Sequence, residues 1–252
     1  MRVFALSDPH LALDTPNKAM DRFGDSWKDH ANTMATAWDA MVTDDDLVIV
    51  PGDVSWARDL TSVAADLDWL AARPGTVVLG KGNHEHWWAS KGKVRAALPE
   101  GMYAVDGDAI RVGDVALAGT RLWDGPGIDW HDQILWQGEP ISREPSEAEQ
   151  AHIAKIWTRQ VTRLRRALDD LDESAPIRIA MVHYPPSGPG MSPQNDATDA
   201  IEAAGVSHCV FGHLHSLDPA QADLVGGDVR GVKYVCASVD FIGFRPVLIG
   251  EW

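Results

Sequence analysis

The chain of 252 residues has only two cysteines and no long apolar run. Cys209 and Cys236 both lie in apolar, strand-like runs, so buried structural thiols are expected and a disulfide framework is not. No run approaches the roughly 20 apolar residues that cross a bilayer. The first apolar stretch, Val3–Leu6, is shorter than the about 7–15 residues of a signal-peptide core and leads directly to Asp8. We therefore expect a cytoplasmic protein without a membrane segment.

Basic residues are also scarce, since 22 of them face 37 acidic residues and give a net charge of −15. A field of that sign repels polyanions, so a broad nucleic-acid-binding surface is not expected. A small anion that meets a locally positive metal centre is still compatible, because salt screens the repulsion over about 10 Å. The apolar share of 45% is that of an ordinary globular domain. Composition leaves the oligomeric state open.

Apolar runs of strand length recur along the chain, each bounded by turn residues. Apolar side chains at helical spacing fill Asp25–Val42 and Asp59–Ala72, between the first of these runs. Such alternation predicts an α/β fold with a largely buried sheet, covering helices and right-handed crossovers. No repeat or linker interrupts the pattern, so a single domain over residues 1–252 is expected. The expected strands are Val3–Leu6, Leu47–Val50, Thr76–Leu79, Ile177–Val182 and His208–Phe211.

The middle of the chain follows a different pattern. Gly113-Asp114 suits a tight hairpin turn between two close-spaced strands. Gly119–Pro145 is an irregular stretch of a length that is usually functional or mobile in a compact domain. Ser146 and Glu149 match a capping box at the start of a helix that runs to about Leu171. Further strands are expected at Met102–Val105, Ala109–Val112, Val115–Ala118, Val232–Ala237 and Pro246–Ile249.

Side chains suited to metal coordination follow the ends of five expected strands. A residue just past a strand is held by a rigid element and lies at the edge where open α/β sheets bind ligands. Together these carboxylate, amide and imidazole donors could hold two divalent cations, which polarise a phosphoryl group and generate hydroxide at neutral pH. The donors are Asp8, His10, Asp53, Asn83, His183, His213 and His215. They indicate a metal-dependent phosphoester hydrolase.

Spacing within these segments favours shared metal ions. Asp8 and His10 are two residues apart and so face one side of an extended segment, as do His213 and His215. The two oxygens of Asp53 can bridge two cations, which a single imidazole cannot do. Mixed imidazole, carboxylate and amide donors suit Mn, Fe, Zn, Co or Ni better than Mg or Ca, and Mn is the metal we expect.

This ordered set of motifs resembles the calcineurin-like metallophosphoesterase superfamily. The resemblance runs from residue 8 to residue 215. It rests on Asp8-x-His10, Gly52-Asp53, Gly82-Asn83-His84-Glu85, His183 and Gly212-His213-x-His215. It implies a central double β-sandwich flanked by α-helices, in four layers ordered α/β/β/α, with a binuclear metal centre.

The resemblance also implies a role for each donor. One metal would be held by Asp8, His10, Asp53 and His215. The other would be held by Asp53, Asn83, His183 and His213, with Asp53 as the bridge. His84 would stand beside the leaving-group oxygen and donate a proton to it, while a metal-bridging hydroxide attacks phosphorus.

Trp56 departs from one branch of this superfamily. Protein Ser/Thr phosphatases place an acidic residue three positions beyond the bridging aspartate, where it orients the catalytic histidine. Trp56 occupies that position, so His84 needs another partner and a protein phosphatase is disfavoured. The tracts Pro51–Arg58, Gly82–Trp88 and Gly119–Asp124 look more like a bacterial group of predicted phosphohydrolases of uncertain substrate.

Five residues near the motifs have a functional and a structural interpretation. Arg121 could clamp a substrate phosphate through its planar guanidinium or form a surface salt bridge, and Arg58 has the same two options. Tyr184 could face substrate from a stiff, proline-rich segment or belong to a rigid connector. Glu85 is expected to shape its loop, and His86 to be packed or exposed instead of catalytic.

Tryptophans and two further histidines leave similar alternatives. Trp123, Trp130 and Trp136 are expected in core packing, with a lid or an aromatic wall for an apolar or base-bearing substrate as the alternative. His30 and His131 could lie in the cleft, but we expect them to be exposed to solvent.

The sequence therefore predicts a binuclear metallophosphoesterase that acts on a small phosphomonoester or phosphodiester. A monoester needs extra positive charge near the metals, which Arg121 could provide, whereas a diester needs an open cleft. A nuclease is the second hypothesis, which the acidic composition and the lack of a basic aromatic stripe disfavour. A non-catalytic interaction module is the third, which the intact ligand set and His84 disfavour.

Overall fold

The computed structural model describes residues 1–135 and 145–252. Within this part of the chain there are two compact units, each with its own sheet. Unit 1 comprises Met1–Asp106 and Ala237–Trp252, and unit 2 comprises Gly107–Cys236. A single domain over the whole chain stays a prediction. Trp136 lies outside the described residues, so its expected role stays a prediction.

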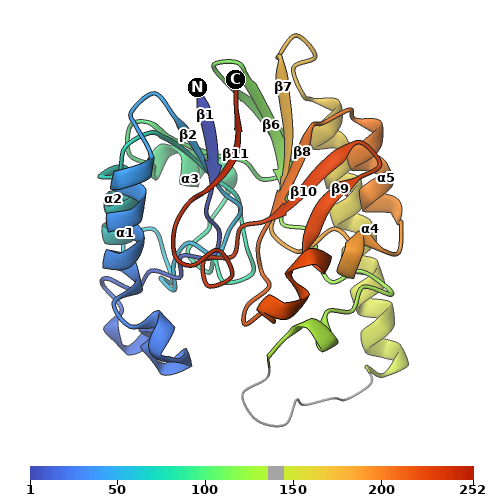
Figure 1. Cartoon of the computed structure of the whole chain (residues 1–252), viewed down its shortest axis with the longest axis horizontal. Coiled ribbons are helices and arrows are strands. Elements are labelled where there is room, and N and C mark those ends of the chain that lie inside the picture. Colours follow the sequence, from blue (N-terminus) through green and yellow to red (C-terminus); the bar gives the residue numbers. More distant parts are fainter. Residues whose placement is uncertain (136–144) are drawn as a thin grey trace. The chain divides into compact units, whose positions relative to one another are not determined.

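Unit 1 contains a five-stranded sheet in the order β11-β1-β2-β3-β4. The first four strands of the chain run parallel, and β11 lies antiparallel to β1 (Figure 1). Every residue of β2 is buried, as expected for an apolar strand inside a parallel sheet. The strands are β1 (Arg2–Ala5), β2 (Leu47–Val50), β3 (Thr76–Leu79), β4 (Met102–Ala104) and β11 (Val247–Glu251).

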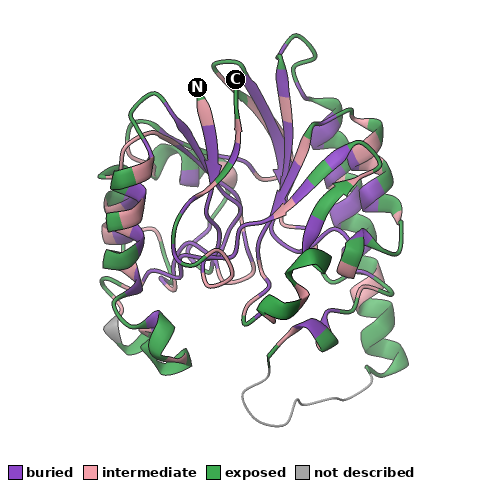
Figure 2. Ribbon diagram, in the orientation of Figure 1, coloured by how far each residue is buried: buried purple, intermediate pink, exposed green. Residues whose placement is uncertain are grey.

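The helices of unit 1 bury the faces that the sequence periodicity predicts. Met34 and Trp38 of α1 and Leu67 and Leu70 of α2 lie in one apolar cluster with side chains of β1, β2 and β3. In Figure 2 the strands are mostly buried, whereas the helices expose their outer surfaces. The helices are α1 (His30–Met41), α2 (Ala64–Ala71) and α3 (Lys91–Ala97), with 3-10 helices at Pro16–Lys18, Met20–Phe23 and Asp25–Trp27.

Unit 2 contains a six-stranded sheet in the order β5-β6-β7-β8-β10-β9. Strands β6, β7, β8 and β10 run parallel, and an antiparallel strand pairs at each edge. The β5–β6 hairpin turns at Gly113, whose φ of 56° lies in the left-handed region, as predicted. The strands are β5 (Asp108–Val112), β6 (Val115–Thr120), β7 (Ile177–Val182), β8 (His208–Phe211), β9 (Gly226–Val229) and β10 (Val232–Cys236).

Two α-helices, α4 (Glu147–Asp169) and α5 (Asp196–Ala203), belong to unit 2. The predicted capping box is confirmed, since Ser146 Oγ accepts from Glu149 N and the Glu149 carboxylate accepts from Ser146 N at 2.9 Å. Helix α4 packs on β5, β6 and α5. Short 3-10 helices lie at His131–Gln133, Pro189–Met191 and Pro219–Leu224.

The predicted α/β class, with helix-flanked sheets, is confirmed. Both cysteines are buried and neither forms a disulfide, as expected. None of the described helices is long and apolar enough to cross a membrane. Among the α-helices and strands of residues 1–135 and 145–252, α3, α5 and β9 were not predicted, because short sequences with few apolar residues gave little periodicity.

Candidate metal centre

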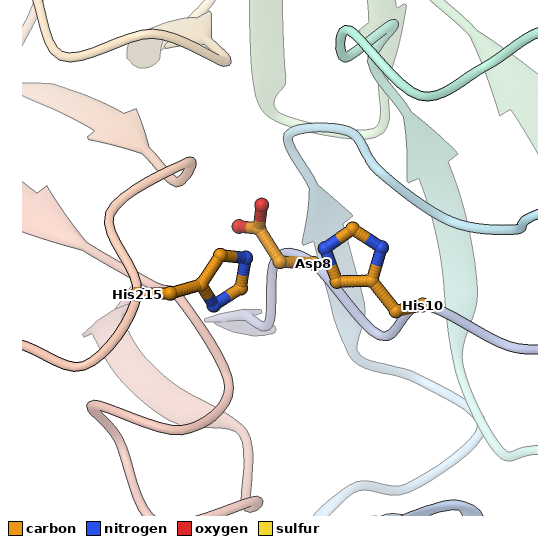
Figure 3. Close-up of side chains that lie close together, drawn as sticks. All are labelled: Asp8, His10 and His215. Carbon is orange, nitrogen blue, oxygen red and sulfur yellow. The ribbon is translucent and has the colours of Figure 1, made fainter. Parts of the chain in front are cut away.

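The loop after β1 presents Asp8 and His10, whose possible ligand atoms lie within 4.8 Å of each other (Figure 3). Both residues are buried and both have positive φ, 60° for Asp8 and 46° for His10. Non-glycine residues rarely adopt this conformation, and it clusters at functional sites. Ser238 Oγ donates to Asp8 Oδ2 at 3.3 Å. The predicted pair is therefore assembled within unit 1.

Asp53 follows β2 and lies next to the same pair. Its φ is 51°, its side chain is buried, and its Oδ2 lies 3.8 Å from His10 Nε2. The backbone N–H of His84 donates to Asp53 Oδ1 at 2.8 Å, and His84 Nε2 lies 4.0 Å from Asp53 Oδ2. The bridging carboxylate expected from the sequence is thus held by the loop that carries the expected proton donor.

Gly82 is the glycine that this arrangement requires. A Cβ at position 82 would lie 2.1 Å from Asp53 Oδ1 and 2.5 Å from Asp53 N. Real Cβ atoms do not approach other atoms so closely, and one of the two contacts is to backbone. Only glycine lets the loops after β2 and β3 meet around the Asp53 carboxylate.

Glu85 fastens these two loops to each other. Its Oε2 accepts from Asp53 N at 3.0 Å and from Gly82 N at 2.5 Å, while its Oε1 accepts from Val54 N at 2.5 Å. The side chain is buried. Hydrogen bonds to a carboxylate are about twice as strong as neutral ones, so Glu85 fixes the Asp53 backbone. The sequence predicted a loop-shaping role for Glu85 but did not reveal that the carboxylate reaches the neighbouring loop.

Trp56 packs against the imidazoles of His10 and His84, both in unit 1. Its ring stacks on His10 with centroids 5.0 Å apart and an interplanar angle of 19°. The His84 ring lies 4.3 Å from it at 49°. The residue three positions beyond Asp53, which is acidic in the protein Ser/Thr phosphatases, is here a tryptophan whose indole contacts His84. The His84 side chain keeps 37% of its surface exposed, so it remains accessible to a ligand.

Unit 2 provides its own set of imidazoles. His183 follows β7 and His213 follows β8, and their possible ligand atoms lie within 4.8 Å of each other. Gly212 N donates to His183 O at 3.0 Å, which ties the two loops together. His213 has a φ of 71°. His215, labelled in Figure 3, lies two residues farther along the same loop.

Tyr184 and Arg121 also belong to unit 2. The Tyr184 ring lies 4.0 Å from that of His213 and 5.2 Å from that of Trp123. The Arg121 guanidinium carbon sits 4.6 Å from the Trp123 ring centroid, and Tyr184 N donates to Arg121 O at 2.9 Å. Both predicted substrate-contacting residues therefore lie in the same cluster as a predicted metal ligand.

Other expectations have mixed outcomes. Asn83 lies half-buried in the loop after β3, while His86 and Arg58 are exposed. The expectation that His30 is exposed is wrong. His30 is buried at the start of α1, where its two ring nitrogens lie 3.0 Å from Trp27 O and 3.1 Å from Pro9 O. His131 is half-buried.

The donor chemistry fits divalent transition metals. Within unit 1, buried carboxylates and an imidazole lie together, and within unit 2 imidazoles do. Imidazole with carboxylate suits Mn, Fe, Zn, Co and Ni. Because Gly82 has no side chain, the Asp53 carboxylate is left uncovered at this position, whereas a larger residue would overlap it.

Comparisons with known proteins agree with this chemistry. A family model described as calcineurin-like phosphoesterase matches residues 1–217. The Gene 66 protein of Mycobacterium phage L5 is 39% identical over 61 residues, which are 24% of this chain and 29% of that protein. The chain thus spans less than a third of that relative in the matched region.

Two solved structures resemble the fold at low sequence identity. Phosphopantetheinyl hydrolase (PptH) from Mycobacterium tuberculosis is 17% identical with a TM-score of 0.53, covering 99% of this chain and 96% of that one. The protein of unknown function AQ665 from Aquifex aeolicus is 13% identical with a TM-score of 0.45, covering 98% and 95%.

Proposed function

Because the chain belongs to the calcineurin-like phosphoesterase family, a group of metal-dependent phosphohydrolases, we propose that it hydrolyses a small phosphomonoester or phosphodiester at a binuclear centre. The observation that carries the proposal is the fixed position of Asp53. Two loops of unit 1 hold this carboxylate through Glu85 and His84 N–H, and its oxygens lie beside His10 and His84.

The proposed ligands come from both units, in the order that the family motifs imply. One metal would be held by Asp8, His10, Asp53 and His215. The other would be held by Asp53, Asn83, His183 and His213, with Asp53 common to both. The arrangement within each unit supports this assignment, since the Asp8–His10 and His183–His213 pairs are already assembled. Manganese is our first choice among the metals that suit these donors, followed by Fe, Zn, Co and Ni.

Divalent ions bound there would polarise the phosphoryl group and provide hydroxide at neutral pH. His84 acts on the leaving group, to which it donates a proton. Its backbone is anchored on Asp53, its ring is partly exposed, and Trp56 limits the directions in which the ring can turn. Packing against an indole thus replaces the orienting acid of the protein phosphatases.

Arg121 and Tyr184, both in unit 2, are the residues proposed to contact the substrate. Arg121 carries a fixed positive charge on a guanidinium that is held over Trp123, and a guanidinium binds phosphate oxygens in pairs. Tyr184, packed on His213, presents a rigid aromatic surface next to a ligand residue. Both contacts favour a small phosphoester over a long polyanion.

The decisive experiment combines metal analysis with a substrate panel. The purified protein, loaded in turn with Mn, Zn, Co and Ni, is assayed with p-nitrophenyl phosphate and its bis ester. Phosphopantetheine esters, prompted by the fold likeness to PptH, and single-stranded DNA complete the panel. We expect turnover of at least one small ester and about two metals per chain. Inertness towards the whole panel with metal bound would refute the proposal, and degradation of DNA alone would favour the nuclease.

Asp53→Asn provides the matched test of the ligand assignment. Removing the bridging charge should lower metal occupancy and abolish turnover, whereas Asp132→Asn removes an exposed charge from a 3-10 helix and should change neither. Wild-type activity in Asp53→Asn would contradict the assignment. Fewer than one metal per chain in the wild type would favour a non-catalytic scaffold.

A further inference from the structure

Unit 2 contains a pocket of about 290 Å³ beside His213, and the function proposed above assigns roles to only two of its lining residues, Tyr184 and His213. Its wall combines aromatic and acidic side chains. Within the described residues, no lysine or arginine lines it. Ligand sites usually measure about 300–1,000 Å³, so this one suits a small group and not a whole nucleotide. The residues that matter most are Trp123, Trp130, Tyr184, Asp124 and Asp129.

The aromatic part of the pocket is held in place before any ligand arrives. Tyr184 packs between His213 and Trp123, with ring centroids 4.0 Å and 5.2 Å away. Trp130 is buried, and its Nε1 donates to Ser187 O at 3.1 Å. Fixed rings lose little entropy on binding, so they form an effective surface for a rigid partner.

The two carboxylates differ in the partners they have. Asp129 Oδ1 accepts from His131 N at 2.8 Å, at the first residue of the 3-10 helix His131–Gln133. Asp124 has neither a hydrogen bond nor an ion pair within residues 1–135 and 145–252. A neutral apolar ligand would cover this charge without compensating it, which is costly. A positively charged ligand would compensate it.

We propose that this pocket binds a compact organic cation, an ammonium group of the size of choline, carried as a substituent on the phosphoester. The inference rests on the proposed hydrolase function and names its substrate class. Aromatic faces attract ammonium groups, and carboxylates add to the attraction. Arg121, outside the lining and two residues before Trp123, offers the complementary charge to the phosphate of such a zwitterion. The net charge of −15 also favours a substrate with a positive end.

Binding tests the pocket without any need for catalysis. Choline and 3,3-dimethylbutanol have nearly the same shape, but only choline carries a charge. Titration of each into the protein, followed by tryptophan fluorescence and calorimetry, should give at least about ten-fold tighter binding of choline. Asp124→Asn should lower choline affinity by about ten-fold or more, and the control Asp132→Asn should not change it. Equal affinities for the two compounds, or unchanged choline binding in Asp124→Asn, would overturn the inference.

Hydrolysis separates this inference from the proposed function. The p-nitrophenyl phosphodiesters of choline and of 3,3-dimethylbutanol are compared on the manganese-loaded protein. We expect a higher kcat/KM for the choline ester and a lower ratio between the two esters in Asp124→Asn. Selective choline binding without hydrolysis of either ester would support the pocket and refute the hydrolase. Equal hydrolysis of both esters without choline binding would support the hydrolase and refute the pocket.

Discussion

Replacing Glu85 by glutamine keeps the shape of a buried side chain while removing its charge and one acceptor oxygen. In the wild type, the two oxygens accept from three backbone N–H groups, those of Asp53, Val54 and Gly82. Glutamine can place its carbonyl oxygen towards only one side. The least costly orientation keeps the oxygen towards Asp53 and Gly82 and turns the NH2 group against Val54 N–H, so two donors face each other.

The expected loss follows from these three contacts. One charge-assisted hydrogen bond, worth about 1.5–3 kcal/mol, is lost, and the other two weaken to the about 0.5–1.5 kcal/mol of neutral bonds. Removing a buried charge returns part of this cost. We therefore expect destabilisation of about 2–4 kcal/mol, which at about 2–4 °C per kcal/mol lowers Tm by about 4–16 °C. Because Asp53 is displaced, metal affinity should also fall by about 10–100-fold.

Two measurements check this prediction. Calorimetry or circular dichroism on the metal-free protein gives the change in Tm, and competition with a chelating dye gives the metal affinity. Glu100→Gln is the control, because it removes the same charge from an exposed position of unit 1. A Tm within about 1 °C of the wild type in Glu85→Gln, together with unchanged metal affinity, would show that the carboxylate does not fasten the loops.

Three further predictions concern unit 1. His84→Ala should keep both metals and lower kcat by about 10²–10⁴-fold, which metal analysis and steady-state kinetics would check; a kcat near that of the wild type would exclude proton donation by His84. Gly82→Ala should abolish activity, because its Cβ would overlap Asp53, whereas Gly92→Ala, where a Cβ has open space, should remain active in the same assay. Burial, opposed by hydrogen bonds from Ser55 and from Leu13 N–H, raises the pKa of Asp66. Its contribution to stability is therefore complete below the unfolded-state pKa of about 3.9 and decreases as pH rises through the folded-state pKa. Relative to the wild type, Asp66→Asn should gain Tm as the pH of thermal unfolding rises from the unfolded-state pKa through the raised folded-state pKa, and the gain should then level off. A Tm difference that is constant with pH would contradict this.

Much of the fold follows from local pattern. Leu47–Val50, Thr76–Leu79, Ile177–Val182 and His208–Phe211 form strands with the bounds that the sequence predicts. Each is a run of mainly apolar residues closed by turn residues, and burial in a parallel sheet leaves little choice of register. The short β9 was missed because Gly226 and Gly227 carry no strand signal; it is defined by its pairing with β10.

For the candidate site, the sequence predicted which residues offer metal-ligand atoms, but not which residues support them. Motif order located the carboxylates and imidazoles, since each follows a strand. Contacts across the chain have no such signal. Ser238 reaches Asp8 over 230 positions, and Trp56 stacks on His10 only because two loops fold side by side. His30 was expected on the surface because histidines are often exposed to solvent, but its two ring nitrogens lie within hydrogen-bond distance of two buried carbonyl groups.

Left-handed backbone at the proposed ligand residues would make the stability of the folded protein depend on metal supply. Asp8, His10, Asp53 and His213 all have φ between 46° and 71°, and each such residue costs on the order of 1–3 kcal/mol. That cost is constant, whereas a bound ion stabilises the native state only while its concentration exceeds the dissociation constant. In a cell starved of the metal, the metal-free copies would therefore unfold and be degraded. The copies that remain would be metal-bound and fully active. Abundance, not specific activity, would report the metal status of the cell.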